Sequence, residues 1–423
     1  MSKSLHPSKT FCLHPFTGLA TREDGAVKAC CRSLPVGWIQ NNSLEEIWNN
    51  GTMREIRRQV LCGERPGACE PCFNLEDQGV ESLRQRHIRD SFPDARSNLY
   101  PNALDSLRDD YSMPFEFPTI EIKINNLCNL KCRMCNPLDS TQWKDWQAVE
   151  QFYKDEGNYL VDAVDKLNLM KQPYVGLFEE KQDFWDNLEK LLPYFRRIEF
   201  AGGEPLMDPY HYKILDMLAP YGDNIELKYA TNGTTLGIKG RSIEDYWPKF
   251  KRIVVNVSID GIDDVYEYIR GNGTFKEVED NVKIFKSFDN VDYVVGAMTV
   301  QANNILQLPK CIDYFLNEMG IVFYSHRVTY PRVLSAQVIP NELKEKVIAE
   351  LQTIQKTFRD YPIVRNNPAL VSVTERQVAD NINFLKNDLS QYWQDCINFN
   401  RALDKTRNQN FLDVIPEFKS YVE

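Results

Sequence analysis

Three closely spaced cysteines are the strongest chemical signal in this sequence. The stretch NNLCNLKCRMCNP carries Cys128, Cys132 and Cys135, directly after the strand-like run TIEIKIN. Thiols on a loop flanked by Asn and Lys do not form an apolar face, and a closed structural zinc site needs four ligands. Three thiolates suit an iron-sulfur cluster that keeps one iron open for an outside ligand. A zinc site or three core cysteines remain the alternatives.

A second group of cysteines lies in the first ninety residues: Cys12, Cys30, Cys31, Cys62, Cys69 and Cys72. The runs TGLATR and AVKACC read as two short strands around EDG, which is a good hairpin turn. The run SLEEIWNNGTMREIRRQVL reads as one helix that begins with a capping box of Ser43 and Glu46 and leads to CEPC. The basic run REIRR within it is expected to be a solvated helix face.

Polar residues and glycines also follow later strand-like runs, in the motifs AGGEP, TNG, SIDG and YIRG. They are Gly202, Gly203, Glu204, Asn232, Ser258, Asp260 and Arg270. Paired glycines let a backbone approach a ligand closely, and an arginine pairs with a carboxylate through its planar fork. Simple turn or helix-cap chemistry is the alternative for the Asn, Ser and Asp, and a surface ion pair is the alternative for the Arg.

Six strand-like runs alternate with segments that are long enough for crossover helices. They are the residues 119–125, 196–206, 224–233, 251–261, 292–301 and 320–331, rich in β-branched and aromatic residues. Repeated βα units give a parallel sheet whose ligand site lies at the carboxyl ends of the strands. The cysteine loop and the motifs AGGEP, TNG and SIDG lie where a predicted strand ends. The predicted fold class is therefore α/β, with a barrel or part of one.

The motif CNLKCRMC resembles the CxxxCxxC signature of the radical S-adenosylmethionine (radical SAM) superfamily, although Met134 stands where an aromatic residue is usual. This resemblance implies a partial (β/α)6 barrel and a 4Fe-4S cluster that cleaves SAM to a 5′-deoxyadenosyl radical. It also implies a reducing partner such as flavodoxin or ferredoxin. The loop-end residues named above would then contact SAM, with Arg270 on its carboxylate.

The N-terminal cysteines resemble the twitch domain, a short form of the SPASM domain that binds an auxiliary 4Fe-4S cluster. The resemblance implies that Cys12, Cys30, Cys69 and Cys72 are its ligands. Cys30 and Cys31 should point to opposite faces of a strand, so one of them should ligate, and the Gly25 spacing favours Cys30. Cys31 and Cys62 are interpreted as structural, and a zinc site is the main rival. Such a domain usually follows the barrel, whereas here it precedes it.

The predicted division of the chain has four parts. Residues 1–92 form the small α+β cluster domain, 93–118 a linker, 119–331 the partial barrel and 332–423 a mainly helical region. Two or more helices are expected within 136–195, as a substrate wall or as extra packing. Arg407 and the run QNFLDVIPEF are expected to pack beneath the site.

Composition limits the classes of function. With 43% apolar and 26% charged residues the chain reads as globular, and no apolar run is long enough for a membrane span. The formal net charge of −10 disfavours nucleic acid as a partner. Eleven cysteines without a recognisable leader indicate the reducing cytoplasm and metal ligation.

The leading hypothesis is an oxidoreductase that abstracts hydrogen from a peptide or a small polar substrate, with an auxiliary cluster that accepts an electron or binds the substrate. A redox-neutral epimerase is the competing enzyme, with Cys311 or Cys396 as the hydrogen donor. An inactive SAM-binding scaffold is the alternative from another class. The substrate and the oligomeric state are not readable from the sequence.

Overall fold

The computed structural model describes residues 8–91, 104–154, 156 and 159–422. The chain forms two compact units, each assembled from several stretches. The first unit takes residues 1–125, 176–228 and 244–253, and the second takes 126–175, 229–243 and 254–423.

The first unit combines a mixed sheet with helices. Its strand order is β3-β2-β1-β4-β5, in which β1, β4 and β5 are parallel and β1, β2 and β3 are antiparallel. The strands are β1 (Gly18–Thr21), β2 (Ala26–Lys28), β3 (Pro35–Trp38), β4 (Thr119–Ile122), β5 (Arg197–Phe200) and the beginning of β6 (Glu226–Thr231). The helices are α1 (His14–Thr17), α2 (Leu44–Trp48), α3 (Gly51–Cys62), α4 (Glu70–Asp77), α5 (Leu83–Ser91), α8 (Gln182–Leu191), α9 (Pro209–Leu218) and most of α10 (Ile243–Tyr246).

The predicted hairpin is confirmed, but its second strand is shorter than expected. Ala20 pairs with Lys28 across β1 and β2, and Gly25 turns the chain with a φ of 84° that favours glycine. β2 ends at Lys28, so Cys30 and Cys31 lie in the bend and turn that follow. The argument that they point to opposite faces of a strand is therefore wrong.

The single helix predicted from Ser43 onward is also wrong, because the chain forms two helices there. The capping box of Ser43 and Glu46 starts α2, as predicted. The side chain of Asn50 then accepts a hydrogen bond from the backbone N–H of Met53 and starts α3 as a separate helix.

The basic run in α3 is only partly a solvated face. Arg57 is fully buried and donates to the carbonyls of Pro15, Trp48 and Tyr111. It also donates to the side chain of Asn49. Its neighbour Arg58 pairs with Glu55 and Glu64 on the outside, as expected for a solvated face.

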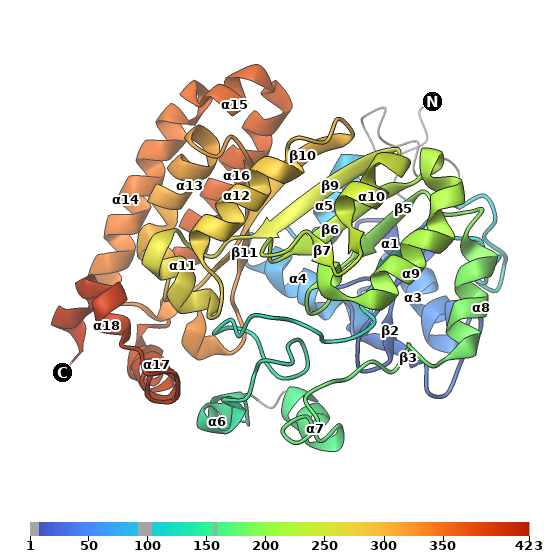
Figure 1. Cartoon of the computed structure of the whole chain (residues 1–423), viewed down its shortest axis with the longest axis horizontal. Coiled ribbons are helices and arrows are strands. Elements are labelled where there is room, and N and C mark those ends of the chain that lie inside the picture. Colours follow the sequence, from blue (N-terminus) through green and yellow to red (C-terminus); the bar gives the residue numbers. More distant parts are fainter. Residues whose placement is uncertain (1–7, 92–103, 155, 157–158, 423) are drawn as a thin grey trace. The chain divides into compact units, whose positions relative to one another are not determined.

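The second unit carries parallel strands and the C-terminal helices. Its strand order is β9-β10-β11, and β10 and β11 pair in parallel, with Val295 opposite Val322. The strands are β9 (Arg252–Ser258, from Val254 on in this unit), β10 (Val291–Val300), β11 (Val322–Arg327) and the short pair β7 (Gly237–Ile238) and β8 (Arg241–Ser242). The helices are α6 (Glu150–Lys154), α7 (Tyr159–Lys166), α11 (Asp263–Arg270), α12 (Phe275–Phe285), α13 (Leu308–Asn317), α14 (Asn341–Thr357), α15 (Pro362–Asn366), α16 (Pro368–Leu385), α17 (Trp393–Arg407) and α18 (Phe411–Val414). The orange and red helices α14 and α16 lie side by side (Figure 1).

The α/β fold class is confirmed, and each of the six predicted runs coincides with a strand, of which β10 begins one residue before its run. The strands of neither unit close into a barrel, as a partial barrel requires. The C-terminal region is mainly helical, and the segment 136–195 contains α6, α7 and α8. The four-part division stays a prediction, and residues 93–103 of the predicted linker lie outside the described residues. Among the described residues, no helix is both long and apolar enough to cross a membrane.

Candidate active site

The three cysteines of the motif lie together in the second unit, on the loop that follows the predicted first barrel strand. Cys128 and Cys132 are buried, and Cys135 is half-buried against the same cluster of side chains. Leu130 and Met134 complete this apolar group, so the unusual Met packs beside the thiols. Burial raises the pKa of the Cys132 and Cys135 thiols, which means that free thiolates are not stable here without a cationic partner.

Hydrogen-bond donors point at two of the three sulfur atoms. The backbone N–H of Leu130 lies 3.4 Å from the Cys128 sulfur, and the Asn232 amide lies 3.9 Å from it. The Arg270 guanidinium lies 3.5 Å from the Cys132 sulfur. Hydrogen bonds of this kind stabilise thiolates and tune the potential of an iron-sulfur cluster. The donor set therefore fits a cluster bound by these thiols.

Side chains downstream of the motif hold the carbonyl groups of the cysteine loop. Ser140 donates to the carbonyl of Leu130 at 2.6 Å, and Thr141 donates to that of Cys128 at 3.1 Å. The indole N–H of Trp143 donates to the carbonyl of Cys132 at 2.8 Å. This part of the segment 136–195 thus fixes the geometry of the loop, which sequence reasoning did not foresee.

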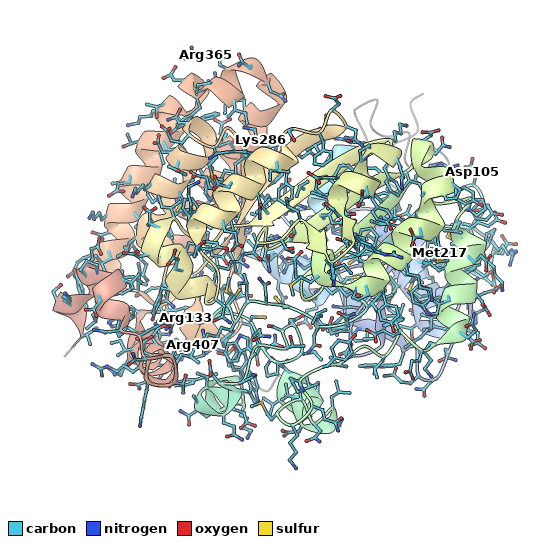
Figure 2. The ribbon with its side chains drawn as sticks, in the orientation of Figure 1. Asp105, Arg133, Met217, Lys286, Arg365 and Arg407 are labelled. Carbon is cyan, nitrogen blue, oxygen red and sulfur yellow. The ribbon has the colours of Figure 1, made fainter. Side chains whose placement is uncertain are left out.

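Two arginines connect the cysteine loop to the C-terminal helix α17, and both are labelled beside that helix in Figure 2. Arg133, which is fully buried between two cysteines of the motif, pairs with Asp404 and lies over the ring of Tyr268 at 3.6 Å. Arg407 donates to the carbonyl of Lys131 at 2.8 Å and pairs with Asp145 at 2.7 Å. The expected packing of Arg407 beneath the site is therefore observed as two specific contacts.

Arg270 and Asp260, both predicted to contact SAM, form an ion pair with each other at 2.7 Å. Burial alone would lower the pKa of the arginine, but the nearby Asp260, Cys132 and Tyr266 side chains together raise that pKa. Asp260 also accepts from the backbone N–H of Thr299. Ser258 is the last residue of β9 and is half-buried. The pair places the guanidinium at the Cys132 sulfur, within reach of the motif.

Asn232 contacts the cysteine loop. Its amide N–H donates to Asn129 at 2.8 Å, and its carbonyl oxygen accepts from Thr234. The TNG motif therefore supports the cysteine loop directly, whatever further contact it makes with a ligand.

The AGGEP motif lies in the first unit, just after β5. Gly202 has a φ of 131°, and a Cβ atom there would lie 3.2 Å from the carbonyl oxygen of Asn125. The buried carboxylate of Glu204 accepts from the backbone N–H of Leu206 at 3.1 Å, and Gly203 lies between Gly202 and Glu204 in the chain. Glu204 thus has a capping role in the turn.

The N-terminal cysteines converge in the first unit. Burial raises the pKa of Cys12, and the charges of Cys30, Cys69 and Cys72 raise it further. Burial and the other thiols raise the pKa of Cys30 to about 11 and that of Cys69 to about 12. In the part of the chain that the structure describes, no three Cys, His, Asp or Glu side chains converge tightly enough for a single metal ion. Four neighbouring thiols fit a larger group with four metal positions.

Cys31 and Cys62 differ from these four, because both are exposed. Although Cys31 is exposed as a residue, burial of its thiol raises its pKa, and the charges of Glu121, Cys30 and Glu199 raise it further. The thiols that act on Cys12 are those of Cys30, Cys69 and Cys72. Cys311 and Cys396, the candidate hydrogen-atom donors of a redox-neutral epimerase, are both buried. Cys311 is buried beside Gln307, and Cys396 is buried beside Asn400.

Comparison with known proteins gives two family matches. The Radical SAM superfamily model matches residues 122–304, and the model of the SPASM iron-sulfur cluster-binding domain matches residues 12–73. The chain therefore carries a radical SAM superfamily domain. Its SPASM-type domain precedes the radical SAM domain, as predicted, and the two domains together imply SAM and two iron-sulfur clusters as cofactors.

Curated relatives match only part of this chain. A GTP 3′,8-cyclase from Staphylococcus epidermidis is 25% identical over 212 residues, which are 47% of this chain and 51% of that protein. A GTP 3′,8-cyclase from Trichodesmium erythraeum is 25% identical over 154 residues, 36% of this chain and 38% of that one. The chain spans about half the length of the first relative and less of the second.

Solved structures that resemble the chain are distant. The structure of anSMEcpe with bound AdoMet is 16% identical with a TM-score of 0.35, and covers 57% of this chain and 61% of that one. Streptococcus suis SuiB bound to S-adenosylmethionine is 16% identical with a TM-score of 0.31, over 77% of this chain and 52% of that one. Scores this low carry no functional argument, so the family assignment depends on the sequence matches.

Proposed function

We propose that the chain is an enzyme that reductively cleaves SAM and abstracts a hydrogen atom from a peptide or a small polar substrate. The observation that supports this most directly is the arrangement of Cys128, Cys132 and Cys135. They pack together, and two of their sulfurs face N–H donors from Asn232 and Arg270. An inactive scaffold would have no need for such a donor set.

In this proposal the three thiolates hold the cluster that binds SAM. When bound, this cluster supplies the single electron that cleaves SAM to methionine and a 5′-deoxyadenosyl radical. Arg270 then binds the SAM carboxylate, because its buried Nε atom has no hydrogen-bond partner among the described residues. Asp260 holds the guanidinium in place from the other side. The AGGEP segment, with Gly202, receives the amino group.

Cys12, Cys30, Cys69 and Cys72 hold the auxiliary cluster in the same proposal. Four thiolates leave no iron open, which favours a role in accepting the electron left after hydrogen abstraction. A one-electron reductant of the flavodoxin or ferredoxin class supplies the electron to the SAM-binding cluster. The relatives named GTP 3′,8-cyclase make a purine nucleotide the rival substrate class.

The test starts with anaerobically reconstituted protein, which should contain about eight irons in two clusters. After chemical reduction with SAM, it should form 5′-deoxyadenosine. Replacing the three motif cysteines with Ala should remove about half of the iron and abolish cleavage. Cys62→Ala, at the exposed end of α3, is the matched control and should change neither. Unchanged iron in the triple variant, or bound zinc in either site, would contradict the proposal.

A further inference from the structure

A fully buried tyrosine on helix α11 lies on the side of that helix that faces the cysteine motif. Tyr266 is 0% exposed, and its ring packs against that of Phe275 with the centroids 5.8 Å apart. Tyr266 precedes Arg270 by one helical turn, so the two side chains lie on the same face of α11. That face is directed at the motif, because the Arg270 guanidinium lies 3.5 Å from the Cys132 sulfur.

The Tyr266 hydroxyl lies beside the cysteine loop. A Cβ atom on Gly273, in the turn after α11, would lie 3.6 Å from the hydroxyl oxygen and 3.0 Å from the side chain of Leu130. Leu130 belongs to the loop itself, and its backbone N–H donates to the Cys128 sulfur. The hydroxyl is therefore next to the part of the loop that carries the thiols.

This hydroxyl has no hydrogen-bond partner among the residues that the structure describes. Buried tyrosine hydroxyls normally have one, and a phenylalanine would fill the same volume without an unpaired polar group. Tyr212, equally buried in the first unit, shows the usual arrangement, because its hydroxyl donates to the carbonyl of Leu206 at 3.1 Å. The unpaired hydroxyl of Tyr266 therefore indicates an acceptor that binds beside the cysteine loop.

The charges around Tyr266 keep it available as a donor. Burial raises its pKa, and the charges of Cys132, Asp260 and Glu277 add to this effect, whereas that of Arg270 opposes it. The phenol thus retains its proton at neutral pH. A neutral phenol beside buried thiols can donate to a sulfur atom that carries negative charge.

We propose that the Tyr266 hydroxyl donates a hydrogen bond to a sulfur of the SAM-binding cluster and raises the reduction potential of that cluster. Reduction adds negative charge, so a donor stabilises the reduced form more than the oxidised one. Tyr266 would add to the donors that already face the motif sulfurs from Leu130 and Arg270. The inference rests on the proposed function, in which this cluster supplies the electron that cleaves SAM.

The test is a redox titration of the reconstituted holoenzyme without SAM, followed by electron paramagnetic resonance. Tyr266→Phe removes only the hydroxyl. At a fixed potential, the ratio of reduced to oxidised SAM-binding cluster should fall about tenfold, the size of one hydrogen bond to a charged group, which is a shift of about 59 mV to lower potential. The N-terminal cluster should keep its potential, and its signal is identified in the variant whose three motif cysteines are replaced with Ala.

Tyr212→Phe is the matched control, because it makes the same chemical change at an equally buried position. It breaks a hydrogen bond within the protein, so it should lower the melting temperature and shift neither potential. Pulsed electron paramagnetic resonance in D₂O gives a second readout. The wild-type SAM-binding cluster should show a coupling to an exchangeable proton that Tyr266→Phe lacks. Iron is measured on every sample, so that incomplete loading is not mistaken for a lower potential.

An unchanged potential in Tyr266→Phe would overturn the proposal, and so would a shift that both clusters share or an unchanged proton coupling. Calorimetry with SAM tests the other possible acceptor. Weaker SAM binding with an unchanged potential would assign the hydroxyl to SAM and would also overturn the proposal.

Formation of 5′-deoxyadenosine is measured on the same preparations. If the wild-type protein cleaves SAM and Tyr266→Phe keeps the wild-type potential, the hydrogen bond alone fails. If the potential shifts as expected and the wild-type protein forms no 5′-deoxyadenosine, the proposed function alone fails.

Discussion

The guanidinium of Arg133, inside the cysteine motif, is paired with the carboxylate of Asp404 on α17, 271 residues later in the chain. Both side chains are buried, and Asn400 and Gln409 lie within hydrogen-bond distance of the same arginine. The C-terminal region is thereby part of the support of the cysteine loop. The pair fixes the cysteine loop to helix α17.

Removing Asp404 should destabilise the fold and the cluster together. Asp404→Ala leaves the buried Arg133 charge without its partner, which should lower the free energy of unfolding by about 3–5 kcal/mol. Denaturant unfolding measures this loss, and iron analysis should show fewer irons per chain. Asp395→Ala on the exposed side of the same helix is the control. Equal stability of the two variants would show that α17 does not support the loop through this pair.

Substitution of Arg407 should alter the properties of the SAM-binding cluster and leave those of the N-terminal cluster unchanged. Arg407→Lys keeps the charge, but a single ammonium cannot reproduce the planar fork that reaches both Asp145 and the Lys131 carbonyl. We expect slower formation of 5′-deoxyadenosine and a shifted electron paramagnetic resonance signal for one cluster only. Identical signals and rates in variant and wild type would remove Arg407 from the support of the motif.

Arg270 should contribute measurably to SAM affinity. Arg270→Ala removes a charge-assisted contact, a loss of about 1.5–3 kcal/mol, and Arg270→Lys should restore only part of it. Calorimetry with SAM gives the affinity, and Arg401→Ala, on the exposed face of α17, is the control. Because Arg270 also pairs with Asp260, thermal melting is recorded for each variant. Wild-type affinity in a folded Ala variant would exclude Arg270 from the SAM site.

Glu121 of β4 and Glu199 of β5 are register partners, and these facing carboxylates predict a pH-dependent stability. Burial and Glu199 raise the pKa of Glu121 above its ordinary value of 4.5, so folding favours the protonated form. The wild-type protein should therefore lose stability, relative to Glu121→Gln, as the pH rises through that raised pKa. At neutral pH the variant should be more stable by about 0.2–1 kcal/mol, the range for like charges on facing strands. Thermal melting from the ordinary value of 4.5 up to about pH 8 tests this, and a difference that shrinks with rising pH would contradict it.

The sequence predicted the elements better than their contacts. Runs of β-branched and aromatic residues located six strands, and the capping box of Ser43 and Glu46 located the start of a helix. The break at Asn50 was missed because an Asn within a helical pattern can equally face solvent. The burial of Arg57 was missed for a related reason, since three of its acceptors are backbone carbonyls, which leave no sequence signal. The pair of Arg133 and Asp404 depends on packing between distant segments, which local patterns do not encode.

The N-terminal cysteines give the last prediction, which decides between Cys30 and Cys31. Cys30→Ser should remove about four of about eight irons, because its thiol belongs to the group with Cys12, Cys69 and Cys72. Cys31→Ser should keep all of the iron, since that thiol faces Glu121. SAM cleavage should persist in both variants if the auxiliary cluster acts only after hydrogen abstraction, so that Cys30→Ser forms 5′-deoxyadenosine without product. Bound zinc at this site predicts instead that Cys30→Ser unfolds and loses cleavage as well, because structural metal binding contributes directly to folding. Iron analysis, SAM cleavage and thermal melting on the same samples distinguish an iron-sulfur cluster from a zinc site. Iron loss in Cys31→Ser alone would make Cys31, and not Cys30, the ligand.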